Sequence, residues 1–215
     1  MTDFSNHQPL DGSAAVATEA GQVGTAGCFV RVGSNARCIL GSAHVMGVVE
    51  CEIIFHPPAT IDGSLQVAKL WDAYGPANSG QATNVLDAAI AVLPAGLRID
   101  PRIGSLGRPR GFNTNLVEHQ RVRIHGAGSG EATSGQILNL DDTTTVTYED
   151  KTVARFAGLV RCQRYSVAGD SGAAVLDANG FVVGVHLCGS PDFSWFCPIS
   201  MVIARWPNIE LITHT

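Results

Sequence analysis

Charged side chains are scarce in this 215-residue sequence, and neither sign dominates. Asp, Glu, Lys and Arg make up 15% of the residues, with 14 basic against 19 acidic side chains and a formal net charge of −5. The basic residues form no cluster or stripe, so nucleic acid is not expected as a partner. No apolar run approaches membrane-spanning length, and the first residues lack the basic and apolar regions of a secretory signal. We therefore expect a cytoplasmic protein with no membrane partner.

The cysteines lack the spacing of a redox or metal motif. The six lie at Cys28, Cys38, Cys51, Cys162, Cys188 and Cys197, and no two form a CxxC pair. In a cytoplasmic chain such cysteines are expected to be free thiols that pack as small apolar side chains. Cys51 lies between His44 and His56, but this spacing matches no zinc pattern. We expect no metal and no organic cofactor.

Glycine is abundant, with 24 copies, and hydrophobic residues make up 45% of the chain. Short apolar runs that end at Gly, Pro or Asn predict strands, so the expected fold is all-β. Residues 1–23 are polar and small, and we expect a flexible N-terminal arm. Segment 96–118 is rich in Gly, Pro and Arg, which predicts a linker between two β halves, 24–95 and 119–215.

The expected strands lie on both sides of this linker. They span 28–32, 37–40, 48–55, 66–71 and 88–93 in the first half, and 121–125, 136–140, 143–148, 159–164, 173–176 and 181–187 in the second. Asn179-Gly180, between the last two strands, is a strong hairpin-turn signal. Apolar residues recur at helical spacing from Ile199 to Trp206, which predicts a short C-terminal helix.

One block of four residues could supply a nucleophile and its oxyanion donors. Gly169-Asp170-Ser171-Gly172 places a hydroxyl between glycines, which let the backbone turn sharply and leave room for a substrate carbonyl. The backbone N–H groups of Gly169 and Ser171 could then converge on an oxyanion. Such a block also occurs by chance in ordinary loops, so it needs a base and an orienting carboxylate elsewhere in the chain.

His44 and Asp87 are the candidates for those two roles. His44 follows an apolar strand and small residues, although a strand-end histidine with a satisfied hydrogen bond would look the same. Asp87 leads directly into the apolar run 88–93, and a partly buried carboxylate needs a partner such as an imidazole N–H. Asp62 and Asp72 are rivals, but neither opens such a strand.

Taken in this order, the three blocks resemble those of trypsin-like serine proteases. Ala43-His44 matches the histidine motif of that family, residues 87–91 resemble its aspartate motif, and residues 169–172 match its serine motif. The opening 24–30 looks similar to that of intracellular bacterial members, and viral processing proteases are also similar. The resemblance implies two six-stranded antiparallel β-barrels with the active site between them.

The same resemblance implies a serine endopeptidase that acts on polypeptides through an acyl-enzyme. Ser171 would attack the scissile carbonyl, His44 would take its proton, and Asp87 would orient His44. Secreted digestive relatives have a cysteine directly after the catalytic histidine, where this chain has Val45, so their disulfides are not transferred. Zymogen-activated relatives pair the aspartate of this motif with a new N-terminus, whereas the partner of Asp170 is left open here.

The resemblance also assigns residues to a specificity pocket. His186, on the expected strand 181–187, takes the place of a small apolar residue, and Ser166, Tyr165 and Gly189 fall on pocket positions. Glutamate-specific bacterial members and many viral proteases have a histidine there, so we expect Glu or Gln before the cut. The alternative is a core histidine bonded to a backbone carbonyl, far from substrate.

Two other functions remain open on the same fold. A catalytically weak, protease-like module could bind peptides without cutting them, although such modules usually lose a triad residue. A serine esterase would use the same residues on a different substrate. Self-cleavage and a regulatory partner are also left open by the sequence.

Overall fold

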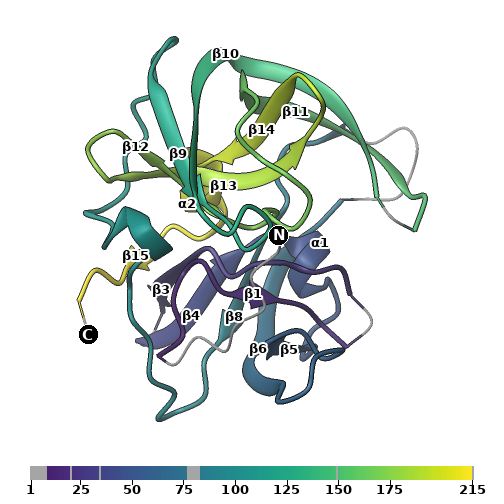
Figure 1. Ribbon diagram of the computed structural model, residues 1–215, viewed down its shortest axis with the longest axis vertical. Coiled ribbons are helices and arrows are strands. Elements are labelled where there is room, and N and C mark those ends of the chain that lie inside the picture. Colours follow the sequence, from purple (N-terminus) through teal and green to yellow (C-terminus); the bar gives the residue numbers. More distant parts are fainter. Residues whose placement is uncertain (1–8, 20, 34, 77–82, 149, 215) are drawn as a thin grey trace.

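Two β-sheets, each built mainly from one half of the chain, make up most of the molecule and lie one above the other in Figure 1. The computed structural model describes residues 9–19, 21–33, 35–76, 83–148 and 150–214. The predicted all-β architecture with a short C-terminal helix is confirmed. Over the described ranges, no helix is long and apolar enough to cross a membrane.

The first sheet has six strands in the order β15-β3-β4-β8-β6-β5. These are β3 (Cys28–Val32), β4 (Ala36–Gly41), β5 (Ile53–His56), β6 (Leu65–Tyr74), β8 (Ala88–Val92) and β15 (Glu210–Leu211). β5 begins at Ile53, five residues later than predicted, because the chain turns before it and Cys51 has a φ of 72°. β15 comes from the C-terminal end, so the half 119–215 also contributes a strand to the first sheet.

The N-terminal segment is part of the first half. β1 (Ala15–Val16) pairs with β2 (Gly24–Thr25), and Ala17 forms a bridge to Phe55 on β5. The segment therefore fills the open side of the first sheet, between β5 and the beginning of β3. Residues 10–18 are buried, which differs from the flexible arm expected over 1–23; residues 1–8 and 20 lie outside the described residues. Alanines and a valine fit this site because their small apolar side chains are fully covered.

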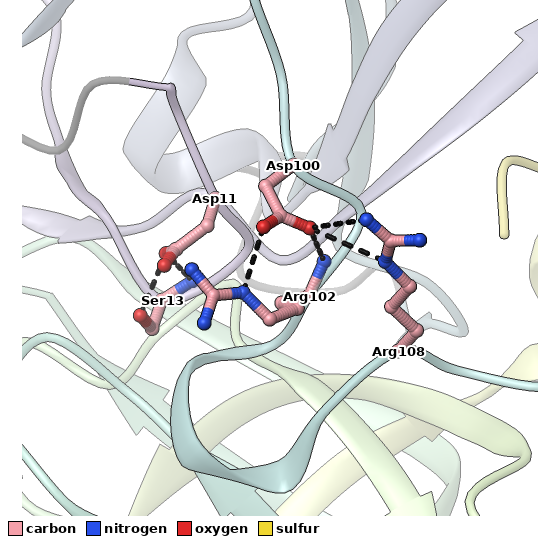
Figure 2. A network of polar contacts seen from close by, with 5 residues as sticks. All are labelled: Asp11, Ser13, Asp100, Arg102 and Arg108. Atoms are coloured by element: carbon pink, nitrogen blue, oxygen red, sulfur yellow. Dashed lines mark hydrogen bonds and ion pairs between the residues drawn. The ribbon is translucent and has the colours of Figure 1, made fainter. Parts of the chain in front are cut away.

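Polar contacts of Asp11 and Asp100 fix the turn at residues 11–14 and the linker that lies beside it (Figure 2). Asp11 Oδ1 accepts hydrogen bonds from the N–H and the hydroxyl of Ser13, at 2.9 and 2.7 Å. Asp100 binds Arg102 at 2.7 Å and Arg108 at 3.4 Å. The two groups are joined by the backbone, where Gly12 N donates to Arg102 O at 2.8 Å. The linker is thus tied to the first half, and it contains one turn of 3₁₀-helix, η1 (Gly104–Leu106).

The second sheet closes on itself, because β10 pairs with both β9 and β11. Its strands are β9 (Arg121–His125), β10 (Ala132–Thr147), β11 (Val153–Gln163), β12 (Ala174–Asp177), β13 (Val182–Gly189) and β14 (Phe193–Pro198), with β7 (Thr83–Asn84) parallel to β11. The two strands predicted over 136–148 are one long strand, β10. Asp142 interrupts its apolar pattern, but Trp195 Nε1 donates to this carboxylate at 2.8 Å. β14 was not predicted.

The largest buried cluster crosses the boundary between the two sheets. It contains Val30 and Leu40 from the first half together with Phe156 and Val185 from the second, all at most 1% exposed. Helix α2 (Ile199–Arg205) packs against β13 of the second sheet and adds Val202 to the same cluster. Buried apolar surface of this kind stabilises the contact between the halves. It holds the two faces that carry the candidate site in a fixed relation.

Candidate active site

His44 lies in a single helical turn at the boundary between the two halves. β4 ends at Gly41, and α1 (Ala43–Met46) follows directly, with the backbone N–H of Met46 donating to Ser42 O at 3.1 Å. The turn ends at Gly47, which has a φ of 92°. The buried neighbours of His44 on α1 anchor the turn, while the His44 side chain keeps 9% of its surface exposed.

Asp87 holds His44 through two hydrogen bonds. His44 Nδ1 lies 2.7 Å from Asp87 Oδ2, and the backbone N–H of His44 donates to Oδ1 at 3.1 Å. The carboxylate is completely buried at the beginning of β8. Burial by itself would raise the pKa of Asp87, but the charge and hydrogen bonds of His44 and a hydrogen bond from Tyr148 hold it below the ordinary value. Asp87 therefore stays ionised, and the Nδ1 atom of His44 carries a proton for this contact.

Tyr148 is a member of this group that the sequence analysis missed. Its hydroxyl donates to Asp87 Oδ2 at 3.1 Å, and its ring centroid lies 5.2 Å from that of His44. The residue follows β10 in the second half and is 61 positions from Asp87 in the sequence. A single tyrosine at a strand end carries no local signal for such a contact.

Ser171 lies in a sharp turn that needs glycine on both sides. Gly169 and Gly172 have φ values of 94° and 90°, a region that other residues rarely adopt. A Cβ on Gly172 would lie 2.5 Å from the Thr25 carbonyl oxygen. The Ser171 hydroxyl donates to Leu187 O at 3.2 Å. The backbone N–H groups of Gly169 and Ser171 donate to no other described residue, so they are available to an incoming oxyanion.

Asp170 has a partner within the chain. Its Oδ1 accepts from the backbone N–H of Ser129 at 2.8 Å, and its Oδ2 accepts from the Ser129 hydroxyl at 2.5 Å and from Val167 N at 2.8 Å. Gly126 permits this approach, since a Cβ there would lie 2.2 Å from Asp170 Oδ1. In the described structure the turn that holds Ser171 is therefore fixed through Asp170 by Ser129 and Val167.

Thr25 fixes the same loop from the other half. Its hydroxyl donates to Gly169 O at 2.9 Å and accepts from Ala127 N at 2.9 Å, and its backbone N–H donates to Ser171 O at 2.8 Å. Thr25 is fully buried on β2. One side chain thus connects the N-terminal segment, the loop after β9 and the turn that holds Ser171.

Thr25→Val is expected to lower the free energy of unfolding by about 1–3 kcal/mol, because it keeps the shape of the side chain but leaves the buried N–H of Ala127 and the partly buried carbonyl of Gly169 without this partner. Thr25→Ser keeps the hydroxyl and is the matched control. Urea denaturation of the three proteins measures the difference. Equal stability of Thr25→Val and Thr25→Ser would show that the hydroxyl does not hold the loop.

His44 and Ser171, two of the three triad candidates, line a cavity of about 370 Å³. His44, Gly169, Ser171, Ser166, His186 and Gly189 line it. The structure therefore brings together candidates that are far apart in the sequence. Arg164 also lines this cavity, but the sequence analysis did not single it out. Its position directly before the expected pocket residues Tyr165 and Ser166 could have indicated it. No Asp or Glu lies among the described lining residues.

His186 and Tyr165 lie at the inner end of this region. His186 is 1% exposed, and its Nδ1 lies 3.2 Å from the Tyr165 hydroxyl. Burial, with a smaller contribution from the charge of His44, lowers the pKa of His186 to about 3 against the opposite effect of a hydrogen bond to the Trp195 backbone, so its ring is neutral near pH 7. His186 therefore has the backbone contact of a core histidine and also lines the cavity. Tyr165, expected at the pocket base, is not one of the lining residues but supports His186 from behind.

Ser166 and Gly189 define the nearby wall. The hydroxyls of Ser166 and Ser194 lie 2.8 Å apart, and both residues are buried. A Cβ on Gly189 would lie 2.7 Å from Ser166 Oγ, so glycine keeps this part of the cavity open.

Cys51 and His56, which the sequence analysis compared with a zinc pattern, do not line the cavity. All six cysteines are free thiols. His56 is buried, and its Nδ1 lies 2.7 Å from Ala15 O, whereas Cys51 is exposed. No three His, Cys, Asp or Glu side chains of the described residues form a group that could hold a metal ion.

Solved structures resemble this arrangement, although no protein-family model matches the sequence and the search of curated proteins finds no relative. Protease A of Thermobifida fusca aligns at a TM-score of 0.71 and 17% identity, over 95% of this chain and 99% of that chain. A Nocardiopsis protease (NAPase) aligns at 0.70 and 18%, over 94% and 100%. A glutamic acid specific serine protease, which uses a histidine triad in substrate binding, aligns at 0.66 and 19%, over 94% and 100%. The chain therefore has the trypsin-like serine protease fold, as the short sequence blocks predicted.

Proposed function

We propose that the protein is a serine endopeptidase that cuts polypeptides through an acyl-enzyme. Ser171 attacks the scissile carbonyl, and His44 takes its proton and later delivers it to the leaving amine. Asp87 holds the His44 ring and stabilises its charged form. The backbone N–H groups of Gly169 and Ser171 bind the oxyanion. No step of this proposal needs a metal or cofactor.

The convergence of groups from both halves on one cavity carries the proposal. The His44–Asp87 pair comes from the first half, whereas Ser171 and the two free N–H groups come from the second. A buried carboxylate bonded to an imidazole that shares a cavity with a serine is the arrangement that nucleophilic catalysis requires. The fold supports the same reaction class but does not by itself establish it.

The strand next to Ser171 offers a place for an extended substrate. β12 pairs with β13 only as far as Val185, so residues 187–189 keep one edge without a strand partner among the described residues. This edge borders the cavity. A peptide could add to it by backbone hydrogen bonds, as extended peptides add to sheet edges in other proteins.

A fluorophosphonate probe tests the proposal directly. We expect the probe to label the purified chain once, with the modified peptide containing Ser171, and we expect the same preparation to hydrolyse a mixed peptide library. Label on another serine would contradict the assignment of the nucleophile. An ester panel run in parallel separates a peptidase from an esterase.

One observation favours a second candidate, a protease-like module that binds peptides without cutting them. The Ser171 hydroxyl donates to Leu187 O, and no hydrogen bond joins it to His44 in the described structure. Catalytic hydrogen bonds are often absent before substrate binds, so this contact alone does not exclude hydrolysis. Peptide binding without label and without product would support the second candidate.

For specificity we propose a preference for Glu or Gln before the cut. The described lining of the cavity has Arg164 and no carboxylate, so it favours an acidic or amide side chain over Lys or Arg. His186 is neutral and lines the cavity, where its contacts with the Tyr165 hydroxyl and with the Trp195 backbone orient its ring. The structural likeness to a glutamic acid specific protease is consistent with this preference.

His186→Ala is expected to lower kcat/KM for substrates with Glu or Gln before the cut by about 10- to 100-fold, because the pocket loses a side chain that lines it and that contacts Tyr165. The fluorophosphonate rate should change little, because that small probe does not fill the pocket. His214→Ala, at an exposed position, is the control. A peptide library varied before the cut gives the measurement. Strong cleavage after Arg, Lys or Phe, with none after Glu or Gln, would contradict the preference.

A further inference from the structure

A long hairpin carries Tyr148 from the second half to the candidate site. β10 ends at Thr147, and the turn that follows is closed by hydrogen bonds from Tyr148 N to Thr152 O, at 2.9 Å, and from Lys151 N to Tyr148 O, at 3.0 Å. Figure 1 shows β10 and β11 as long strands that extend past the body of the second sheet. The position of Tyr148 is therefore set by the length and docking of this hairpin.

The hairpin is docked on the segment that leads into Asp87. β7 pairs with β11 in a parallel arrangement, with Asn84 opposite Phe156, and Asn84 Nδ2 donates to Arg155 O at 3.1 Å. Asp87 follows Asn84 by only three residues. The contact between Tyr148 and Asp87 is thus supported by a backbone pairing between the same two segments.

Tyr148 contacts two members of the candidate triad at once. Its hydroxyl donates to Asp87 Oδ2, the same oxygen that lies 2.7 Å from His44 Nδ1. Its ring is tilted by 51° to the imidazole at a centroid distance of 5.2 Å. Both rings border the cavity. One side chain therefore restrains the carboxylate and the imidazole together.

We propose that Tyr148 is a positioning residue, whose hydroxyl fixes the carboxylate of Asp87 and whose ring holds the imidazole of His44 for proton transfer. The proposal rests on the proposed function, because it assigns Tyr148 a role in that triad. A fully buried carboxylate has lone pairs that water cannot reach, so each donor from the chain limits the orientations it can adopt. The donor comes from the opposite half, so the triad is complete only when the two halves are docked.

The chemistry of the phenol suits this task. Burial and the nearby charge of Asp87 raise the pKa of Tyr148 above its ordinary value. The hydroxyl therefore keeps its proton near neutral pH and donates a hydrogen bond to Asp87. Its hydrogen bond stabilises the ionised form of Asp87 and lowers the basicity of this carboxylate. Asp87 therefore attracts the His44 proton less strongly than it would without Tyr148.

Tyr148→Phe removes the hydroxyl and keeps the ring against His44. We expect kcat for the preferred peptide to fall about 10- to 100-fold, as for loss of a hydrogen bond to a charged group, with little change in KM. We expect the acid limb of the kcat/KM profile to move to higher pH, because Asp87 then holds the His44 proton more strongly. Tyr74→Phe, at an exposed position on β6, is the matched control.

Several outcomes would overturn the proposal. Kinetics and a pH profile equal to those of wild type would show that the hydroxyl has no role, and a rise in KM with kcat unchanged would make Tyr148 a substrate contact. A lower melting temperature with an unshifted pH profile would make it merely structural.

A spectroscopic readout separates this proposal from the proposed function. The proton shared by His44 Nδ1 and Asp87 gives a downfield NMR resonance that does not require turnover. We expect this resonance to shift or broaden in Tyr148→Phe and to stay unchanged in Tyr74→Phe. If wild type neither labels nor hydrolyses, the proposed function fails, and an unshifted resonance in Tyr148→Phe would overturn the positioning role separately.

Discussion

Ser171→Ala is expected to lower kcat for peptide hydrolysis by about 10⁶-fold and to abolish fluorophosphonate labelling, because the attacking oxygen is lost. The turn itself should survive, since Gly169, Gly172 and the contacts of Asp170 and Thr25 are unchanged. The hydroxyl makes one hydrogen bond in the described structure, to Leu187 O. Loss of activity should therefore be accompanied by nearly unchanged thermal stability.

The measurement combines single-turnover kinetics with a melting curve on the same preparation. Ser64→Ala is the matched control, because the Ser64 hydroxyl donates to Pro57 O in the first half, remote from the cavity. Ser64→Ala should retain labelling and turnover. Peptide hydrolysis that persists in a clean Ser171→Ala preparation would remove this serine from the mechanism.

Asp87→Asn should leave a folded protein whose kcat is lower by about 10⁴-fold. The amide is nearly isosteric with the carboxylate but presents an N–H toward His44 Nδ1. His44 would then carry its proton on the other ring nitrogen and could not accept one from Ser171. Asp62→Asn, in an exposed loop, is the control and should behave as wild type. Equal kinetics of the two variants would show that Asp87 does not orient the base.

The same substitution has a predictable effect on stability. The pKa of Asp87 in the folded protein is below its ordinary value, so its ionised form stabilises the fold above the pKa of the unfolded state. This contribution is lost as the pH falls through the folded pKa. The difference in free energy of unfolding between wild type and Asp87→Asn should therefore narrow on acidification. Urea denaturation across a pH series measures it, and a constant difference would contradict the ionised assignment.

The sequence was sufficient to predict a contact or a turn where the local pattern and the chemistry of the residue agree. Asp87 was preferred to Asp72 because it opens an apolar strand, and the structure pairs it with His44. Asp72 instead accepts hydrogen bonds from Arg205 and Trp206, at 2.7 and 2.9 Å, and ties the C-terminal helix to β6. The hairpin predicted at Asn179-Gly180 joins β12 to β13 as expected.

The sequence was insufficient where a contact depends on long-range packing. The partner of Asp170 is Ser129, which lies 41 positions away in a loop with no motif of its own. Tyr148 reaches Asp87 only because the hairpin has a particular length. β10 was divided in two because Asp142 looks like a turn residue, and only the packed Trp195 shows that a strand can carry it there.

The N-terminal segment was misread for a related reason. Its small and polar residues lack the alternation of a strand, but they fill a narrow gap in the first sheet where larger side chains would not fit. Gly12 illustrates the constraint, since a Cβ there would lie 2.2 Å from Gly27 O. Composition alone cannot distinguish such a closely packed segment from a solvated one.

The pairing of β15 with β3 also affects when the protein can fold during its synthesis. It joins Glu210 to Arg31 and Leu211 to Val30, residues from opposite ends of the chain. Ribosomes extend a chain at roughly 5–20 residues per second, so β3 emerges many seconds before its outer partner exists. Until then its edge is an unpaired template for aggregation. Translation past residue 211 is therefore the event that completes the first sheet, and shortening the chain by a few residues there should harm its yield in cells more than its chemistry.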